Sequence, residues 1–351
     1  MDIWVSPLRL ELAYEFRISR WSYRHRDNVV IRLEQDGLIG YGEAAPNARY
    51  DESAESCNAA LARLVAVIGD RVEPYRHIMH RVNAAFPGEF AAKTALDMAL
   101  LDLLGKRLGA PLYEILGLEP RGPMPISLTI GIDKFEMVAE KVREAAPFSV
   151  LKMKLGSGTD RELIRTVRRI TSVPIRVDAN EGWADREHAA RELDWLAKQG
   201  IELVEQPMPA LNREDMVWLK ARSPLPLIAD ESLAGPEDVY HLGDQFHGVN
   251  VKLMKSGGIL SALRTVESAK SLGMSIMLGC MIESGLAIGA AAQLASLVDY
   301  LDLDSNVLLR RDPFEGHPVE DGCLMVQNRP GLGVQPKSDQ DFKWMRLEGQ
   351  A

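Results

Sequence analysis

Three acidic residues each follow a short apolar segment, and their spacing could build a metal site. Asp178 follows Ile-Arg-Val, Glu205 follows Glu-Leu-Val and Asp230 follows Leu-Ile-Ala. If these segments are neighbouring parallel strands, their carboxyl ends lie ~5 Å apart and the acids can converge on one point. A hard divalent cation would remove the repulsion between them, and all-oxygen ligands favour Mg²⁺ over zinc. We therefore predict one bound Mg²⁺, the alternative being three separate solvated carboxylates.

Three lysines in the same part of the chain could transfer protons. Lys152 and Lys154 are two residues apart, so on a strand both point to one face, and Lys252 lies four predicted strands further along. A substrate between them would meet an amine or ammonium on each side. A lysine acts as a base only when it is neutral, and desolvation or nearby positive charge lowers its pKa. A Lys-x-Lys pair alone is more typical of a solvated surface. Lys255 is expected to leave the strand and reach a helix or solvent.

Short apolar segments that alternate with helical ones would position these residues. We predict strands at 126–132, 150–155, 174–177, 202–205, 227–229, 249–253, 275–278 and 300–303. They recur roughly every 25 residues, which is typical of repeated βα units, and eight such strands close a (β/α)₈ barrel. The first part of the chain differs. It predicts antiparallel strands at 29–33 and 38–42, a helix capped by Ser53 whose core stripe extends to Ile68, and a helix at 91–108.

Composition limits the classes of function. The net charge of -9 argues against a nucleic-acid partner. Three widely spaced cysteines, no basic leader and no apolar run of membrane-spanning length indicate a cytoplasmic protein without a membrane partner. We expect a small-molecule substrate and leave a homo-oligomer open. A catalytically silent barrel would have lost a lysine or a ligand, and a metal-dependent hydrolase would need histidines at strand ends; neither pattern is found.

The ordered set of motifs resembles the enolase superfamily and, within it, the muconate lactonising enzyme subgroup. The motifs are Lys152-Met153-Lys154, Asp178-Ala179-Asn180, Glu205-Gln206-Pro207, Asp230-Glu231-Ser232 and Lys252-Leu253-Met254-Lys255-Ser256-Gly257-Gly258. The resemblance implies a modified TIM barrel, (β/α)₇β, over residues 121–314. It also implies an α+β capping domain over 1–120, completed by 315–351. It implies that the three acids bind Mg²⁺ and that Lys154 and Lys252 act as acid and base on opposite faces of the substrate. Lys152 would hold the substrate carboxylate and the enolate oxygen.

The predicted eighth strand indicates which reaction the subgroup machinery performs. Asp302 and Asp304 share one face and resemble the Asp-x-Asp motif of dipeptide epimerases, which captures the free ammonium of a dipeptide. The resemblance implies inversion of the α-carbon of the C-terminal residue by two-lysine proton transfer. An alternative pairs these acids with Arg310 and Arg311. The corresponding alternative functions are N-acylamino acid racemase, o-succinylbenzoate synthase and muconate cycloisomerase.

The loop expected at 17–27 would read the substrate side chain. In Ala-Glu epimerases an arginine of this loop pairs with the glutamate, and here Trp21 takes that position, flanked by Arg20 and Arg24. All three are candidate substrate-binding residues, and an apolar second residue against Trp21 is an alternative. Cys280 is expected to be a buried small residue rather than a nucleophile, and Glu283 a hydrogen-bonding group near the site.

Overall fold

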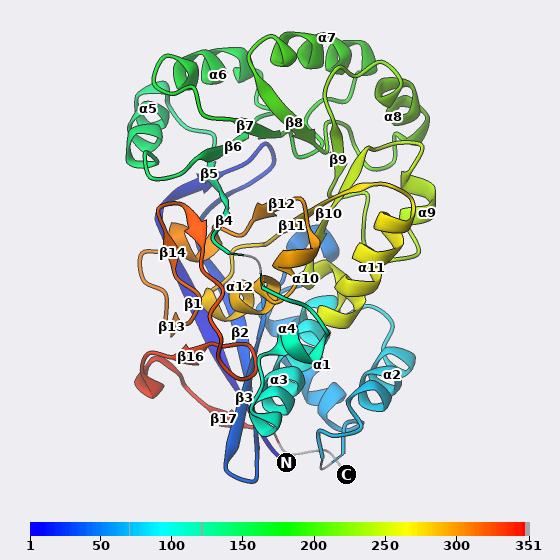
Figure 1. The fold of residues 1–351 in the computed structure, drawn as a ribbon, viewed down its shortest axis with the longest axis vertical. Helices are drawn as coiled ribbons and strands as arrows, with labels where there is room; N and C mark the ends of the chain where they lie inside the picture. The colour runs from blue at the N-terminus through cyan, green and yellow to red at the C-terminus, as the bar shows by residue number, and fades with distance from the viewer. Residues whose placement is uncertain (70, 121, 348–351) are drawn as a thin grey trace.

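The computed structural model describes residues 1–69, 71–120 and 122–347, and its upper half in Figure 1 is a barrel of parallel strands. The strands run in chain order around one sheet: β5 (Ser127–Ile130), β6 (Val150–Lys154), β7 (Ile175–Asp178), β8 (Ile201–Glu205), β9 (Leu227–Ala229), β10 (Gly248–Lys252), β11 (Ser275–Gly279) and β12 (Tyr300–Asp302). A bridge between Ile126 and Leu301 and a 3.3 Å hydrogen bond from Ser127 Oγ to the Leu301 carbonyl join the first strand to the last. The predicted barrel is confirmed.

Helices connect successive strands on the outside of the barrel. They are α5 (Phe135–Glu144), α6 (Asp160–Arg168), α7 (Arg186–Ala197), α8 (Arg213–Lys220), α9 (Val239–Leu242), α10 (Leu253–Ser256), α11 (Ile259–Ser271) and α12 (Gly285–Ala292). The last strand, β12, leads into the 3₁₀ turn η3 (Ser305–Leu308) rather than a helix. The architecture is therefore (β/α)₇β, as the family resemblance implies, and not the eight complete βα units that strand spacing alone suggests.

An antiparallel sheet and four helices form the lower half of the molecule (Figure 1). The sheet has the order β17-β1-β2-β3, with β1 (Asp2–Arg17), β2 (Ser22–Gln35), β3 (Leu38–Ala44) and β17 (Met345–Arg346), so the two ends of the described chain pair with each other. The helices are α1 (Ala54–Val65), α2 (Tyr75–Ala85), α3 (Phe90–Leu108) and α4 (Leu112–Ile115). Short strands β4 (Met124–Pro125), β14 (Val319–Glu320) and β15 (Cys323–Leu324) form a third sheet, and β13 (Phe314–Glu315) pairs with β16 (Gln335–Pro336).

Helices α1 and α3 of this half begin within one residue of the positions that the sequence predicts. Ser53 caps α1 with a reciprocal capping box, as expected, but the helix ends at Val65 and Ile68 is buried beyond it. Helix α3 lies directly on β3, because glycines there leave room for it. A Cβ at Gly42 would come 1.8 Å from the Ala95 carbonyl oxygen, so any side chain would force the helix away.

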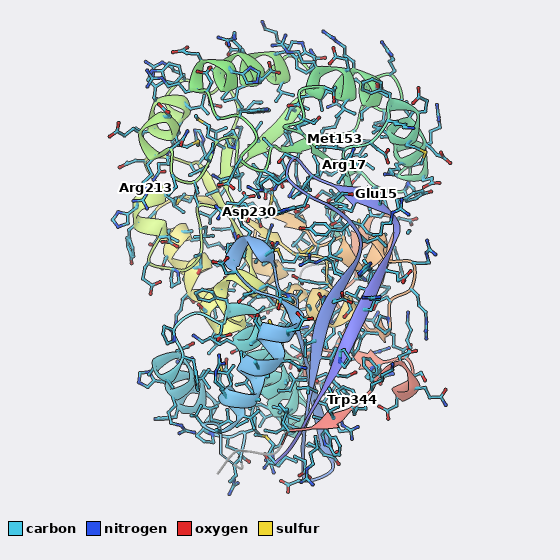
Figure 2. All side chains as sticks on the ribbon, turned by 180° about the vertical axis from the view of Figure 1, so that it is seen from behind. Glu15, Arg17, Met153, Arg213, Asp230 and Trp344 are labelled. Atoms are coloured by element: carbon cyan, nitrogen blue, oxygen red, sulfur yellow. The ribbon has the colours of Figure 1, made fainter. Side chains whose placement is uncertain are left out.

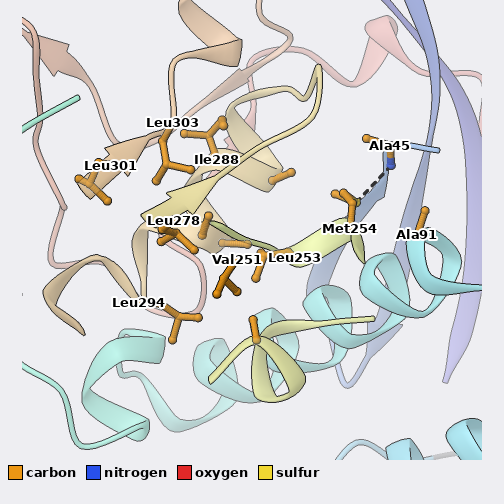
Figure 3. Close-up of a cluster of buried hydrophobic side chains, with 14 of the residues drawn as sticks. Ala45, Ala91, Val251, Leu253, Met254, Leu278, Ile288, Leu294, Leu301 and Leu303 are labelled. Atoms are coloured by element: carbon orange, nitrogen blue, oxygen red, sulfur yellow. Dashed lines mark hydrogen bonds between the residues drawn. The ribbon is translucent and has the colours of Figure 1, made fainter. Parts of the chain in front are cut away.

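Helix α10 joins the two halves. Thr94 Oγ1 of α3 donates to the Leu253 carbonyl at 2.8 Å, and the Ala45 amide contacts Met254 Sδ at 3.3 Å, as the dashed line in Figure 3 shows. Buried apolar side chains from β10, β11, β12 and α12 lie to one side of this contact, in the same hydrophobic cluster (Figure 3). The end of β10, which carries Lys252, is thereby fixed against the N-terminal half.

The β1–β2 hairpin runs along the long axis of the molecule, from the antiparallel sheet to the barrel. Figure 2 shows it rising from the sheet edge near Trp344 to the barrel, where Glu15 and Arg17 lie. Its pairing register shifts between Glu11 and Phe16, and beyond this bulge the Arg17 carbonyl accepts from the Ile132 amide at 2.9 Å. The expected loop at 17–27 is shorter than predicted, because β2 already begins at Ser22. None of the helices in the described ranges is long and apolar enough to cross a membrane.

Candidate active site

The three predicted metal ligands converge at the carboxyl ends of adjacent strands. Asp178 ends β7, Glu205 ends β8, and Asp230 directly follows β9. One oxygen from each lies within 4.8 Å of the others, and all three side chains are buried. This is the geometry that the order of strands in a parallel barrel requires.

Hydrogen bonds from neighbouring residues fix the orientation of these carboxylates. Asn250 Nδ2 donates to Glu205 Oε1 at 2.8 Å, and the Asn180 amide donates to Asp178 Oδ1 at 2.9 Å. Gln206 has a left-handed backbone, φ 36°, and its Oε1 accepts from the Asp230 amide at 2.9 Å. Such a conformation is costly for a residue other than glycine, and this bond to the next strand holds it in place.

The donor set fits a hard divalent cation. It is entirely carboxylate, and the buried Glu205 Oε2 has no hydrogen-bond partner among the described residues, although Lys152 Nζ lies 2.6 Å away. Burial and the charge of Asp178 raise the pKa of Glu205 to about 8. The protein alone thus does not favour the ionised form of Glu205, and Mg²⁺ bound beside it would.

The three predicted lysines line the same pocket. Lys152 Nζ lies 2.6 Å from Asp302 Oδ2 and 3.4 Å from Asp178 Oδ2. Lys154 Nζ donates to Asp178 Oδ2 at 2.6 Å. On the other side of the barrel mouth, Lys252 Nζ donates to Asp230 Oδ2 at 2.8 Å. Because β6 and β10 are separated by β7, β8 and β9, Lys154 and Lys252 enter the pocket from opposite sides.

Electrostatics at two of these lysines differ from the expectation. Burial lowers the pKa of Lys152, but Asp302 and Glu205 outweigh it and hold the pKa well above the ordinary value. Burial likewise lowers the pKa of Lys252, and Asp230 and Glu205 raise it well above the ordinary value. The carboxylates, rather than neighbouring cations, therefore dominate the field at both amines.

Lys255 was predicted to reach either a helix or solvent. It lies in helix α10, and the prediction of solvent exposure is wrong. Its side chain is buried, and Nζ donates to Asp230 Oδ1 at 2.6 Å and to the Asn250 carbonyl at 3.2 Å. It thus binds the face of Asp230 that points away from the pocket, while Lys252 binds the face toward it. Burial lowers its pKa.

Asp302, which ends β12, and Asp304 both line the pocket. Asp302 Oδ1 accepts from Ser127 Oγ at 2.7 Å, and Asp304 Oδ2 accepts from the Thr129 amide at 2.6 Å. Among the described residues no arginine pairs with either acid: the ion-pair partner of Asp302 is Lys152, and Arg311 pairs with Asp341 on the surface. Burial and the charge of Asp302 raise the pKa of Asp304 to about 6.

Of the three residues of the hairpin that were predicted to bind substrate, two reach the site. Arg20 and Trp21 line the pocket, but Arg24 does not: its side chain is 83% exposed and pairs with Glu15 at 3.2 Å. Arg20 donates to Glu231 Oε1 at 2.6 Å and also pairs with Glu181. The hairpin tip is thus tied by charge to residues that directly follow the metal-ligand strands.

Several other pocket residues are absent from the sequence-based list, among them the polar residues Arg26, Arg49, Tyr50 and Glu231. The hydrophilic sequence around Arg26 predicted a loop, but it did not indicate in which direction the Arg26 side chain points. Cys280 donates to the Asp302 carbonyl at 3.2 Å, and burial raises its pKa well above the ordinary value, which agrees with an inert thiol. Glu283 accepts from the Met281 amide at 2.7 Å, as expected of a hydrogen-bonding group.

Family models match both halves of the chain. Residues 3–117 match the mandelate racemase / muconate lactonizing enzyme N-terminal domain, and residues 134–340 match the enolase C-terminal domain-like family. The chain belongs to the enolase superfamily. The predicted family is therefore confirmed.

Relatives within the superfamily are close over nearly the full length. The chain is 41% identical to the L-Ala-D/L-Glu epimerase of Bacteroides thetaiotaomicron, over 93% of this chain and 86% of the relative. It is also 41% identical to the L-Ala-D/L-amino acid epimerase of Pedosphaera parvula, over 96% and 100%. A crystal structure of the dipeptide epimerase of Cytophaga hutchinsonii, complexed with Mg and D-Ala-L-Val, superposes with a TM-score of 0.94 at 28% identity, covering 99% of each chain.

Proposed function

We propose that this member of the superfamily is a magnesium-dependent dipeptide epimerase, an isomerase that inverts the α-carbon of the C-terminal residue. One observation carries the proposal. Lys154 and Lys252 approach the pocket from opposite sides, between a carboxylate triad at one edge and the Asp302–Asp304 pair at another. The names of the three relatives support the same class of reaction.

The charges of the pocket orient such a substrate. Asp178, Glu205 and Asp230 would hold Mg²⁺, whose positive charge, once bound, offsets the charge that develops on the substrate carboxylate as the α-proton leaves. Lys152 lies between Glu205 and Asp302 and would bind the same carboxylate. At the opposite end the free ammonium of the dipeptide would pair with Asp302 and Asp304. Of these two buried acids only Asp302 forms an ion pair, with Lys152 at 2.6 Å, whereas Asp304 accepts from the Thr129 amide, so a second cation there is stabilising.

The two lysines then carry out the proton transfers that invert the α-carbon. One removes the α-proton onto its Nζ and becomes an ammonium, and the other, already protonated, returns a proton to the opposite face. The α-carbon changes configuration, and the proton count of the enzyme is restored by exchange with solvent. A single lysine fixed in a strand cannot reach both faces of a carbon that is held at both ends.

The chain is further proposed to act in the cytoplasm on small dipeptides, without a nucleic-acid or membrane partner. Its net charge of -9 and its three free cysteines support this. The proposed domains are a capping domain at 1–120 and 315–351 and a barrel at 121–314.

Deuterium incorporation tests the proposal. Dipeptides and matching N-acylamino acids are incubated with the protein and Mg²⁺ in deuterated water, and mass spectrometry and chiral chromatography follow the products. We expect dipeptides to gain one deuterium and to yield both epimers. Faster turnover of the N-acylamino acids would instead support the racemase or succinylbenzoate synthase alternative.

A further inference from the structure

Lys255 is a buried lysine of α10 that, unlike Lys152, Lys154 and Lys252, does not line the pocket. We propose that it is a positioning residue. Its ammonium holds the ends of β9 and β10 together and thereby sets the affinity of the carboxylate triad, Asp178, Glu205 and Asp230, for Mg²⁺. The inference rests on the proposed function, because it concerns the metal site of that reaction.

The Lys255 side chain has no proton to spare for a substrate. Its Nζ donates to the Asp230 carbonyl at 2.6 Å, to Asp230 Oδ1 at 2.6 Å and to the Asn250 carbonyl at 3.2 Å. An ammonium has three N–H donors, and carbonyl and carboxylate oxygens only accept. A neutral amine would turn its lone pair toward one of these oxygens, in a place where the side chain is only 1% exposed. Lys255 is therefore held as a cation with every proton in use, and it cannot also act as the base.

These contacts lie where the backbone ladder between β9 and β10 stops. The last pair in register is Ala229 with Val249. The residues that follow on the two strands are Asp230 and Asn250, and the carbonyls of both accept from Lys255. Buried backbone carbonyls need donors, so the ammonium supplies across this gap the hydrogen bonds that the ladder no longer makes.

Two of the three metal ligands depend on this bridge. Asp230 is bound directly, through Oδ1. Glu205 is reached through Asn250, whose Nδ2 donates to Glu205 Oε1 at 2.8 Å. The Asn250 side chain is closely packed, because a Cβ on Gly279 would lie 2.5 Å from its Oδ1. A shift of either strand end therefore moves a metal ligand.

The short helix α10, which carries Lys255, is held by the other half of the molecule. Thr94 Oγ1 donates to the Leu253 carbonyl at 2.8 Å, and the Ala45 amide contacts Met254 Sδ at 3.3 Å (Figure 3). Lys255 thus reaches the strand ends from a fixed support. The length of its side chain then sets how closely the two strand ends approach each other.

The alternative is that Lys255 acts only through its charge, and the two roles predict opposite signs. An ammonium beside the triad repels a divalent cation, so its removal would tighten Mg²⁺ binding if charge alone mattered. If the ammonium holds the ligands in place, its removal should weaken binding. Groups that orient metal ligands in this way typically change metal affinity by roughly 10- to 100-fold.

Lys255→Met tests the inference, because it removes the ammonium but keeps an unbranched side chain. Calorimetry measures Mg²⁺ binding to the whole protein without substrate, and melting curves are recorded with and without Mg²⁺. We expect Mg²⁺ to bind roughly 10- to 100-fold more weakly and to raise Tm less than in wild type. Dipeptide exchange should slow equally for both epimers at limiting Mg²⁺, and excess Mg²⁺ should restore most of it. A role in stability alone would lower Tm and leave the Mg²⁺ affinity unchanged.

Lys106→Met is the matched control. Lys106 Nζ also bridges a backbone carbonyl and a carboxylate, those of Ile39 at 2.8 Å and Asp102 at 2.7 Å, but in the other half of the molecule. This variant should lower Tm without changing the Mg²⁺ affinity. Lys255→Gln keeps two N–H donors without the charge, and it answers the question if Lys255→Met does not fold. It should weaken Mg²⁺ binding in the same direction by a smaller factor.

The outcomes separate the inference from the proposed function. Unchanged or tighter Mg²⁺ binding in a folded Lys255 variant would overturn the inference, and so would an equal loss of affinity in Lys106→Met. Weaker Mg²⁺ binding in the Lys255 variants alone supports it. If that pattern is found while wild type exchanges no dipeptide, the inference stands and the proposed function is refuted.

Discussion

Replacing Lys154 or Lys252 with alanine should abolish net epimerisation while leaving exchange at one face of the α-carbon. The remaining lysine can still remove a proton and return a deuteron on its own side, so each variant should exchange one epimer of the substrate with solvent. A positioned general base contributes roughly 10²- to 10⁴-fold. The two variants should therefore show opposite epimer preferences, each with a ratio of this order.

The structure makes these substitutions interpretable. When Lys252 is removed, Asp230 keeps its 2.6 Å ion pair with Lys255. When Lys154 is removed, Asp178 still has Lys152 within 3.4 Å. Neither metal ligand is left as an unpaired buried charge, so lost activity is assigned to proton transfer rather than to collapse of the site.

Lys255→Ala serves as the contrasting variant. It removes the partner of two backbone carbonyls and of Asp230 Oδ1, which should cost about 3–5 kcal/mol of unfolding free energy. Any residual activity should exchange the α-proton of both epimers at equal rates. The assay is deuterium exchange of each pure epimer, followed by NMR. Wild-type epimerisation in Lys252→Ala together with an inactive Lys255→Ala would refute the assignment of the base on β10.

Three further outcomes are expected. EDTA should abolish activity and Mg²⁺ or Mn²⁺ restore it, with Asp178→Asn weakening metal binding in calorimetry; full activity of the metal-free protein would contradict this. Asp302→Asn should lower kcat/KM for dipeptides by roughly 10-fold or more but spare N-acetylated analogues, which have no ammonium. Burial raises the pKa of Asp97 from 3.8 to about 6, which corresponds to on the order of 3 kcal/mol of unfolding free energy, present below pH 4 and lost as pH rises through 6. Urea titrations of Asp97→Asn should show a flatter dependence between pH 4 and 7, and identical pH profiles would exclude the effect.

Much of the barrel could be predicted because its strands are buried on both faces. Such strands are short apolar runs, and 227–229 was predicted with the bounds of β9. Their charged ends then had to meet, since parallel strands place equivalent ends at one edge. The predicted ligands and lysines converge on one pocket for this reason, and no knowledge of side-chain contacts was needed to place them there.

The hairpin could not be predicted in the same way. β1 was missed as a strand of 16 residues, although Leu8 to Leu12 alternate as in a half-buried strand, because it continues beyond the apolar residues to a polar tip and its partner strand is also largely polar there. The register shift between Glu11 and Phe16 breaks the simple alternation of faces. Arg24 and Arg26 share one side of an ideal strand, yet Arg26 alone reaches the pocket. Only tertiary structure determines that difference.

The hairpin also explains how one barrel chemistry can serve different side chains. A strand of 16 residues rises roughly 3.3 Å per residue, so β1 reaches about 50 Å, from the sheet edge at β17 to the mouth of the barrel. Its far end is fixed by the bond from Ile132 to Arg17 and by the ion pairs of Arg20. The pocket-lining residues of the hairpin are thus carried by two paired strands and the turn between them. A substitution among these hairpin residues can change which side chain is bound while the proton-transfer groups, which belong to other strands, keep their positions.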